Sequence, residues 1–542
     1  MFPNIFKGYS REEAAQDIIA SVTVGLIAFP LALSISTATG LPPQAGLVAT
    51  IIGGILAAIL GGTRFVVSGP NTIFFFTIIE AFNTVGFEGL LLATFIMGLI
   101  LIGAGFAKLG FIIDYVPYSV TLGFMSGLSV VIISMVLKEC LGLTQPLAHG
   151  NLIIQSWTLY FTNFWNTNIF SFLMSVIVIT SLRYYKGSRY PVFIGAILAT
   201  TLIAMIFRLP VETIGSRYAD FSTIFSRARI PNLLSINLFV ESLPYALTMT
   251  AVAVINSLLN ATVVHDKTNT PVNPNQELIA QGAANVASAC FGGLPVSATL
   301  SRTLVNIEQG AKTSLSSLFQ AIFVWVLLLF SLPLLKKIPL ACLNAVLLSI
   351  AFDILEPKKL WEQIKLPHGE SVVCMTTFFL TIFVNNGVAI LVGTMIAAFL
   401  FIHKMSHMTN VQSESTFSDI HEGIKVYHID GPFFFGASSR LKVLLEEDKI
   451  TDKVIVFDLK NMPLIDSTGS VLLTKIIKEN KDTEFIMINV NEEIQAFFQH
   501  IGLSKKRHYS VTNNLEEAIK IAKQIIKEKK KEEKTNHETT ET

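Results

Sequence analysis

About fourteen apolar segments fill the first three-quarters of this chain, and they constrain its fold more than any other feature. Hydrophobic residues make up 51% of the sequence, and charged residues only 15%. A helix of about 20 apolar residues crosses a membrane, and several segments approach that length. We therefore predict an α-helical polytopic membrane protein with about 14 spans. The segments lie near residues 17–36, 45–60, 65–81, 89–107, 112–137, 168–182, 191–207, 241–264, 277–291, 298–310, 314–332, 339–355, 371–384 and 386–403.

The segments form two sets of about seven, separated by the polar stretch 208–240. Because each set is odd in number, the two halves would have opposite orientations, which is the inverted-repeat (7+7) plan of many transporters. Positive charges favour the inner side, so Lys7, Arg11 and Lys404 predict that both termini are cytoplasmic. We expect a multi-pass protein of the cell's inner (plasma) membrane. Four arginines in the predicted outer loop depart from the charge rule: Arg208, Arg217, Arg227 and Arg229.

Two breaks interrupt the apolar sequence at corresponding places in the two halves. Ser68-Gly69-Pro70 lies in the third segment, and Gly292-Gly293-Leu294-Pro295 precedes the tenth. Gly and Pro interrupt regular structure, and unwound backbone at membrane depth is tolerated only inside protein or along a cavity. Paired breaks of this kind indicate a transporter's central site. We predict a half-helix after each break, with the two N-termini facing each other near the midplane.

Arg302 follows the second break among small, hydroxylated residues. A helix N-terminus carries a partial positive charge and free N–H groups, and Arg302 would add a full charge. Thr72, after the first break, has a hydroxyl that can donate to an oxyanion. Together these features predict an anion site. The alternative is a cytoplasmic loop whose arginine faces water, but charges within membrane segments are uncommon and usually functional.

The composition changes after His403. We predict a transmembrane domain over residues 1–407, a linker over 408–418, a cytoplasmic α/β domain over 419–530, and a charged, disordered tail over 531–542. The α/β domain should be one helix-covered sheet. Its predicted strands are 423–430, 433–435, 453–459 and 484–490, and its predicted helices are 437–447, 466–479, 491–501 and 514–527.

Other classes of function find no support in the sequence. The four cysteines, Cys140, Cys290, Cys342 and Cys374, form no metal-ligand or disulfide pattern. The net charge of +1 argues neither for nor against nucleic-acid binding, but the sequence has no concentrated basic stripe with interleaved aromatic residues, so we predict no nucleic-acid partner. No nucleophile–base pair is recognisable, so we predict no enzymatic activity, no cofactor and no metal.

An ordered set of motifs covers nearly the whole chain. It includes Pro30-Leu31-Ala32-Leu33, Gly61-Gly62-Thr63-Arg64, Asn275-Gln276-Glu277-Leu278 and Ser301-Arg302-Thr303. On these motifs the chain resembles the SulP anion permease family, which includes sulfate permeases, animal anion exchangers and prestin. Its C-terminal part is similar to a STAS domain, on Val456-Phe457-Asp458-Leu459 and Ile465-Asp466-Ser467-Thr468-Gly469.

The resemblance implies a core domain that binds substrate and a gate domain against which the core moves. Spans one to four and eight to eleven would form the core, and the remaining spans the gate. The family site falls on Leu31 and Ile35 in the first span, whose apolar side chains cannot hydrogen-bond an anion. The remaining family positions are Asn71, Thr299, Ser301 and Arg302. Thr72 is not a family position, and we include it because its hydroxyl can donate to an anion.

The resemblance also points to positions for coupling and regulation. Many bacterial relatives carry Glu or Asp where this chain has Asn256, and a sodium-type site would include the position of Asn260. An amide neither titrates nor carries charge, although Asn256 could instead simply pack against a neighbouring helix and Glu80 could do the coupling. In the STAS part, Asp466, Ser467 and Thr468 match a regulatory turn, or act only as a helix N-cap.

We therefore predict a secondary transporter of small anions, of the bicarbonate, sulfate, chloride or C4-dicarboxylate class. It would work by alternating access, as a uniporter or exchanger. The alternatives are a proton- or sodium-coupled anion symporter, or a channel-like or motor-like membrane protein. The expected partners are the anion, the lipid bilayer and, by resemblance, a second copy of the chain in a homodimer.

Overall fold

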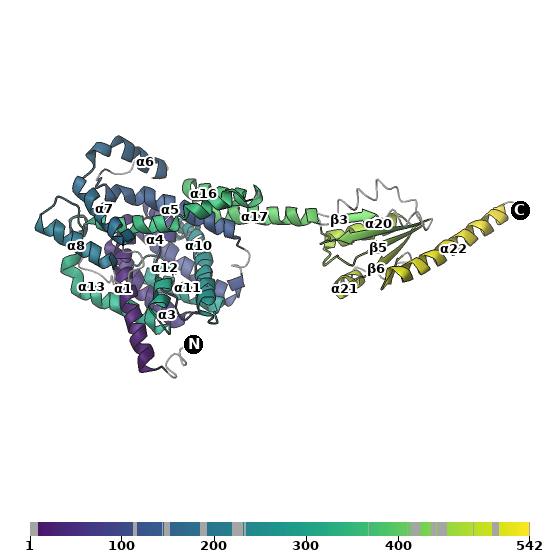
Figure 1. The fold of residues 1–542 in the computed structure, drawn as a ribbon, viewed down its shortest axis with the longest axis horizontal. Helices are drawn as coiled ribbons and strands as arrows, with labels where there is room; N and C mark the ends of the chain where they lie inside the picture. The colour runs from purple at the N-terminus through teal and green to yellow at the C-terminus, as the bar shows by residue number, and fades with distance from the viewer. Residues whose placement is uncertain are drawn as a thin grey trace. The chain divides into compact units, whose positions relative to one another are not determined.

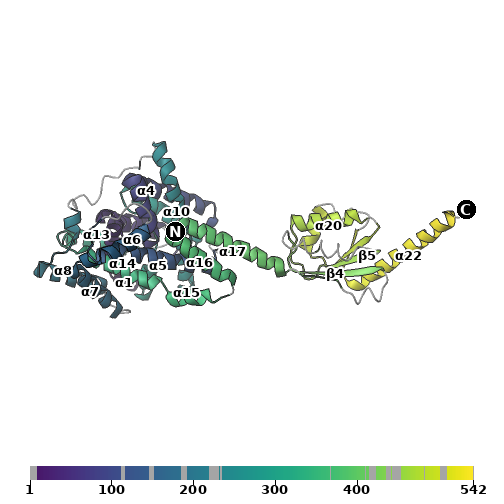
Figure 2. The ribbon, with the colours of Figure 1, turned by 90° about the horizontal axis from the view of Figure 1, so that it is seen from above.

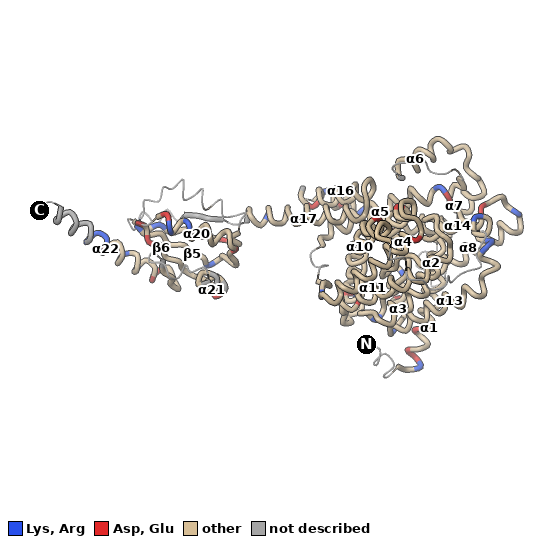
Figure 3. The backbone as a smooth tube through the Cα atoms, turned by 180° about the vertical axis from the view of Figure 1, so that it is seen from behind, with Lys and Arg blue, Asp and Glu red and all other residues tan. Residues whose placement is uncertain are grey.

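The computed structural model describes residues 9–111, 116–143, 145, 152–184, 192–218, 231, 235–366, 368–408, 410–413, 423–434, 441, 453–480, 482–500 and 509–540. The chain divides into two compact units, Met1–Ala397 and Ala398–Thr542. Figures 1 and 2 show the first as a helix bundle and the second as a sheet with helices. Charged residues are sparse along the helices of the first unit (Figure 3).

Eight helices among the described residues are long and apolar enough to cross a membrane. The third of these, over Thr72–Phe106, includes the predicted third and fourth spans. Gly86, with a φ of 70°, is non-helical and marks a kink between two helices that this range joins. The exact number of spans therefore stays a prediction, while the helical transporter architecture is clear.

The bundle contains two groups of helices. In the first, which matches the predicted core, α10 and α11 pack on α4, and α13 packs on α1. Aromatic and aliphatic side chains such as Phe74, Phe75 and Leu33 are fully buried there. The members of this core group are α1 (Arg11–Ala38), α2 (Pro43–Val48), α3 (Gly54–Leu60), α4 (Phe75–Phe106), α10 (Ile236–Thr268), α11 (Pro274–Cys290), α12 (Leu300–Glu308) and α13 (Leu315–Leu335).

The second group matches the predicted gate. Helices α14 and α16 pack on α5, and α14 also packs on α7. The members of this gate group are α5 (Tyr118–Cys140), α7 (Ile169–Tyr184), α8 (Val192–Ile206), α14 (Leu340–Ile354), α16 (His368–Phe383) and α17 (Asn386–Met408). Three shorter helices connect these elements: α6 (Leu152–Thr162), α9 (Ile214–Arg217) and α15 (Pro357–Ile364).

A short strand forms at the first predicted break and another directly after the second, which the sequence did not indicate. Strand β1 (Ser68–Pro70) pairs antiparallel with β2 (Val296–Ala298), so that Gly69 lies opposite Ser297. The 3-10 helix η3 (Thr72–Phe74) follows β1 and leads into α4, while α12 follows β2. The strand pair satisfies backbone groups that would otherwise be unpaired at membrane depth.

A buried carboxylate anchors α12 at its far end. Asp17 of α1 is 0% exposed and accepts hydrogen bonds from the backbone N–H groups of Lys312 and Thr313, at 2.6 and 3.2 Å. The Thr313 hydroxyl and Tyr9 also donate to it. Burial raises the pKa of Tyr9, and so does its hydrogen bond to Asp17. The turn after α12 is therefore fixed to the start of α1.

The second unit is a five-stranded sheet in the order β3-β4-β5-β6-β7. Only the β3–β4 pair is antiparallel. Helices α20 and α21 cover one face, with Ile477 and Phe498 in the core, and α22 covers the other through Ala518 and Ala522. Figure 2 shows α20 and α22 beside the sheet. The bounds are β3 (Asn410–Ser413), β4 (Ile424–Asp430), β5 (Val454–Asp458), β6 (Glu484–Ile488), β7 (Tyr509–Thr512), α20 (Ser467–Glu479), α21 (Glu492–His500) and α22 (Leu515–Thr540).

The structure corrects three predictions for this unit. Residues 410–413, which we placed in a linker, form β3, because even polar residues can pair at a sheet edge. Strand β7 was missed, and of the predicted strand 433–435 Phe433 makes an isolated bridge to Ile465, while residue 435 lies outside the described residues. The predicted tail 531–542 continues α22 to Thr540, since Lys and Glu favour helix. Most of the predicted helix 437–447 lies outside the described residues.

Candidate anion-binding site

Two helices begin at opposite ends of the antiparallel β1–β2 pair. Asn71 precedes η3, and Thr299 precedes α12. Thr299 N donates to the Val67 carbonyl oxygen at 2.9 Å, which extends the connection between the two breaks. The first-turn N–H groups of both helices lack intrahelical acceptors. The predicted pair of helix N-termini is therefore held together by backbone hydrogen bonds.

Arg302 lies in the first turn of α12 and is 2% exposed. Its Nη2 donates to the Pro70 carbonyl oxygen at 2.8 Å, whereas Nη1 has no hydrogen-bond partner among the described residues. Nor does any described carboxylate lie within ion-pair distance of it. A Cβ atom on Gly69 would be only 2.8 Å from Nη1, so the glycine leaves the space that the guanidinium occupies. In the described part of the chain, Arg302 is thus a buried charge without a counter-charge.

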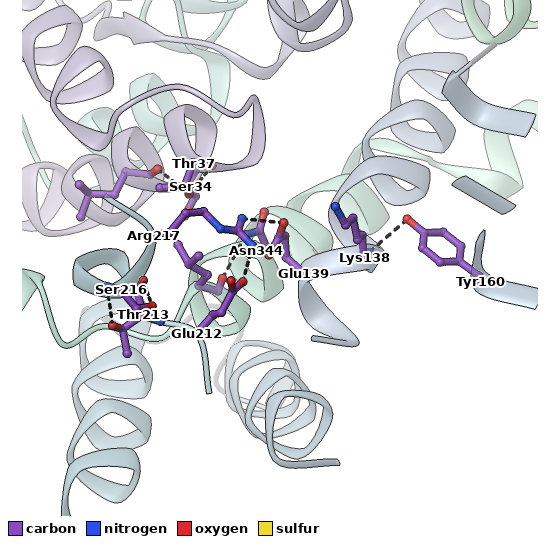
Figure 4. A network of polar contacts seen from close by, with 12 residues as sticks. Ser34, Thr37, Lys138, Glu139, Tyr160, Glu212, Thr213, Ser216, Arg217 and Asn344 are labelled. Atoms are coloured by element: carbon purple, nitrogen blue, oxygen red, sulfur yellow. Dashed lines mark hydrogen bonds and ion pairs between the residues drawn. The ribbon is translucent and has the colours of Figure 1, made fainter. Parts of the chain in front are cut away.

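Arg217 shows what a compensated arginine looks like in the same unit. Figure 4 shows it between Glu139, whose Oε1 is 2.8 Å from Nη1, and Glu212. Burial opposes the charge, but the hydrogen bond and charge of Glu139 outweigh it and raise the pKa of Arg217 above its usual value. This pairing accounts for a cation in the predicted outer loop.

The Asn71 side chain connects the start of η3 to β2. Its Oδ1 accepts from the Ile73 N–H at 3.3 Å, and its Nδ2 donates to the Ala298 carbonyl oxygen at 2.9 Å. Asn71 is partly exposed, while Thr72 is buried at 9% exposure. Both predicted residues therefore lie at the start of η3, Asn71 as its N-cap and Thr72 as its first residue, but the Asn71 amide is already engaged.

The two predicted hydroxyls at the start of α12, those of Thr299 and Ser301, differ in hydrogen bonding and exposure. The Thr299 hydroxyl donates to the Val67 carbonyl oxygen at 2.8 Å and is 6% exposed, so its hydrogen is directed away from a ligand. Ser301 is exposed in the first turn of α12, next to Leu300, which is 41% exposed. Ser301 is therefore the hydroxyl of this pair that an anion can reach.

Asn256 and Asn260, one turn apart on α10, both contact β2. Asn256 Nδ2 donates to the Ser297 hydroxyl at 2.9 Å and to the Ala298 carbonyl oxygen at 2.6 Å. Asn260 Nδ2 reaches the same carbonyl at 3.3 Å, and its Oδ1 has no hydrogen-bond partner among the described residues. The structure thus brings both predicted coupling positions to the site's strand pair.

Sequence analysis missed a polar stripe on α11 that supports both strands. Gln281 Nε2 donates to the Ser68 hydroxyl at 2.6 Å and to buried Glu277 at 2.8 Å. Asn285 exchanges two hydrogen bonds of 2.8 Å with the backbone of Val296. The spacing of Glu277, Gln281 and Asn285 by four residues places them on one helix face, and that spacing was the available signal.

The other predicted positions lie as follows. Leu31 and Ile35 are buried at 7% and 3% exposure within the hydrophobic core. In the second unit, Asp466 Oδ1 accepts from the Gly469 N–H at 2.7 Å as the N-cap of α20. Ser467 and Thr468 are exposed in the first turn of that helix. No cluster of metal-binding side chains occurs in the part of the chain that the structure describes.

This architecture defines a multi-pass membrane transporter with a C-terminal α/β domain. Residues 15–377 match the sulfate permease family, and residues 418–518 match the STAS domain. The chain therefore belongs to the sulfate permease family, whose members are anion transporters and not enzymes.

Named relatives agree with this assignment. The chain is 28% identical over 522 residues to the putative sulfate transporter YvdB of Bacillus subtilis, covering 93% of this chain and 97% of the relative. It is 29% identical over 504 residues to the bicarbonate transporter BicA of Picosynechococcus, covering 86% and 87%.

Solved structures of the same fold are also available for comparison. The overall structure of SLC26A9 matches with a TM-score of 0.84 at 18% identity, covering 96% of this chain and 92% of that one. The transmembrane domain of a cyanobacterial BicA matches with a TM-score of 0.63 at 25% identity, covering 72% and 98%.

Proposed function

We propose that the protein is a secondary transporter of small anions that works by alternating access. The anion would be held between the N-termini of η3–α4 and α12. The observation that carries this proposal is Arg302, a buried guanidinium without a carboxylate partner among the described residues. An unpaired buried charge costs several kcal/mol, and a bound anion would offset that cost.

The groups around Arg302 support anion binding and not cation binding. The N-terminus of α12 contributes partial positive charge, the exposed Ser301 hydroxyl can donate, and Nη1 of Arg302 has a hydrogen bond to give. Asn71 is less available, because its amide is engaged by Ile73 and Ala298. We therefore retain Asn71, Thr72 and Thr299 as residues that shape the site and assign the main anion contacts to Ser301 and Arg302.

The chemical class of the substrate follows from these donors only in part. Hydroxyl, backbone N–H and guanidinium groups bind sulfate, bicarbonate, chloride and C4-dicarboxylates alike. The relatives named above are described as sulfate and bicarbonate transporters. Leu31 and Ile35 offer only apolar surface, which favours no particular oxyanion.

We further propose uniport or exchange without obligatory proton or sodium coupling. Asn256 and Asn260 donate to a backbone carbonyl, so they need no proton or cation to complete the contact. The second candidate is a coupled symporter that uses Glu80 of α4, a half-buried carboxylate. A channel-like or motor-like protein is the remaining alternative.

Uptake into liposomes by the purified protein tests these proposals. The vesicles would be screened with labelled sulfate, bicarbonate, chloride, fumarate and succinate at clamped membrane potential. Downhill uptake or exchange of at least one anion supports the proposal. Uphill accumulation driven by an imposed proton or sodium gradient would reject uncoupled transport and favour the symporter. Uptake that never saturates with anion concentration would favour a channel.

The remaining assignments are proposals by resemblance. We place both termini in the cytoplasm, in a homodimer, and assign a regulatory or assembly role to the STAS domain. The exposed hydroxyls of Ser467 and Thr468 at the start of α20 are accessible to a modifying enzyme. The Asp466 cap alone fits an ordinary helix start equally well.

A further inference from the structure

The turn between α16 and α17 connects the gate group to the core group beside the candidate site. Asn386, the first residue of α17, is 0% exposed, and its Nδ2 donates to the Ile73 carbonyl oxygen at 3.0 Å. Ile73 lies in η3, directly after Thr72. One neutral hydrogen bond therefore joins the gate group to the helix start that presents the site.

A second contact occurs at the next residue. A Cβ atom on Gly387 would lie 2.8 Å from Oγ1 and 3.1 Å from Cβ of Thr248 in α10. The absence of a side chain at Gly387 thus leaves room for the Thr248 side chain against the start of α17. Asn385 has a different role, since its Oδ1 accepts from the Val388 N–H at 2.8 Å within α17. Asn386 and Gly387 face the core group, and Asn385 supports the turn itself.

These contacts are weaker than those that hold the site together. Asn386 Oδ1 has no hydrogen-bond partner among the described residues, so the amide uses only part of its capacity. The strands β1 and β2 are instead joined by a backbone ladder and by the Asn285 and Gln281 amides. A relative movement of the two groups would break the Asn386 contact before it broke the site.

We propose that Asn386 and Gly387 form a releasable contact between gate and core, and that Asn386 is the positioning residue that holds it. The inference rests on the proposed function, because alternating access requires the two groups to move past each other. Asn386 would act through η3 and not by touching the anion. Release of the Ile73 carbonyl and of Thr248 would then accompany each translocation step.

A reversible cross-link tests the need for release. Disulfides require Cβ atoms about 3.5–4.5 Å apart, so Thr248→Cys combined with Gly387→Cys needs only a small local shift. We expect oxidation to lower anion uptake at least about tenfold and reductant to restore it, while equilibrium binding of the labelled anion persists. The two single-cysteine variants are controls for the native thiols. A fully cross-linked protein that transports at the rate of the reduced protein would overturn the proposal.

A second measurement needs no transport. The rate at which a thiol reagent modifies Thr248→Cys reports how often the turn leaves α10. We expect Asn386→Leu to raise this rate about fivefold, the factor for one hydrogen bond of ordinary net strength. Asn385→Ala should leave it unchanged, because the described side-chain hydrogen bond of Asn385 is to the Val388 N–H in the first turn of α17. Equal rates in the wild type and Asn386→Leu would show that Asn386 does not hold the contact.

The two measurements separate this inference from the proposed function. A reduced wild-type protein that takes up none of the five anions contradicts the proposed function, and thiol accessibility still decides whether Asn386 holds the turn. Normal uptake by the reduced protein, together with unaffected uptake after cross-linking, contradicts only the release of the contact.

Discussion

The Asn256 side-chain amide donates a 2.6 Å hydrogen bond to the carbonyl oxygen of Ala298. Asn71 and Asn260 donate to the same oxygen at 2.9 and 3.3 Å. The Ala298 carbonyl oxygen of β2 thus accepts hydrogen bonds from Asn71, which precedes η3, and from two side-chain amides of α10. A carboxylic acid can donate in this way only while it is protonated, so the asparagines make the contact independent of pH.

Replacing Asn256 by an acid should create pH dependence. In Asn256→Asp, and in the longer Asn256→Glu, the protonated carboxyl can still donate to Ala298, so uptake should be retained at acidic pH. As the pH rises and the carboxyl ionises, it repels both the carbonyl oxygen and the anion, and uptake should fall. Initial rates of uptake across the pH range measure this. Asn273→Asp is the control, because Asp serves equally well at that helix N-cap.

Arg302 should supply the charge on which anion binding depends. Arg302→Ala should lower anion affinity by about 10- to 100-fold, the range for a hydrogen bond to a charged group. Arg302→Lys should retain only part of the anion affinity, since lysine lacks the planar, forked guanidinium group. Binding of labelled anion to purified, monodisperse protein measures this effect. Arg183→Ala, which removes an exposed arginine, is the control, and wild-type affinity in Arg302→Ala would refute the assignment.

Gly69→Ala should disturb the site through Arg302. The added methyl group would lie 2.8 Å from Nη1 and 3.2 Å from Nη2, so the guanidinium has to move. We expect weaker anion binding with little change in insertion. Gly103→Ala on α4 is the matched control, because a Cβ atom there would have no neighbour within 4 Å. Equal losses in both variants would point to a general effect of the added methyl group.

Removal of residues 410–542 should separate binding from regulation. The cut precedes β3, which pairs with β4 and so belongs to the second unit. We expect the truncated protein to insert and to bind anion with affinity within about twofold of the full chain, while transport rate or expression changes. A correctly inserted truncation without anion binding would mean that the STAS domain helps to build the site.

The hydrophobic pattern and the two Gly/Pro breaks were sufficient to predict the helical transporter fold. They also indicated where helices restart, because Gly69, Pro70 and Pro295 cannot continue a helix and small polar residues follow them. The β1–β2 pair escaped prediction, since three-residue strands carry too little periodicity and their pairing depends on a partner over 200 residues away.

The roles of individual side chains were harder to predict. Sequence reasoning gave Asn71 and Thr299 as ligands, whereas the structure directs the Asn71 amide to Ala298 and the Thr299 hydroxyl to Val67. An amide or hydroxyl has the same chemistry whether it binds an anion or the backbone, so only geometry distinguishes the two. The role of Asn386 could not be predicted either, because its acceptor, Ile73, is remote in sequence.

The hydrogen-bonded pairing of β1 with β2 also bears on how selectivity is preserved. Each strand leads into one of the two helices that face the site, and the ladder keeps their separation fixed. An anion would therefore meet the same arrangement of donors on whichever side of the membrane the site is open. Entry and exit would discriminate among anions equally, and the direction of net flux would be set by concentrations and membrane potential alone.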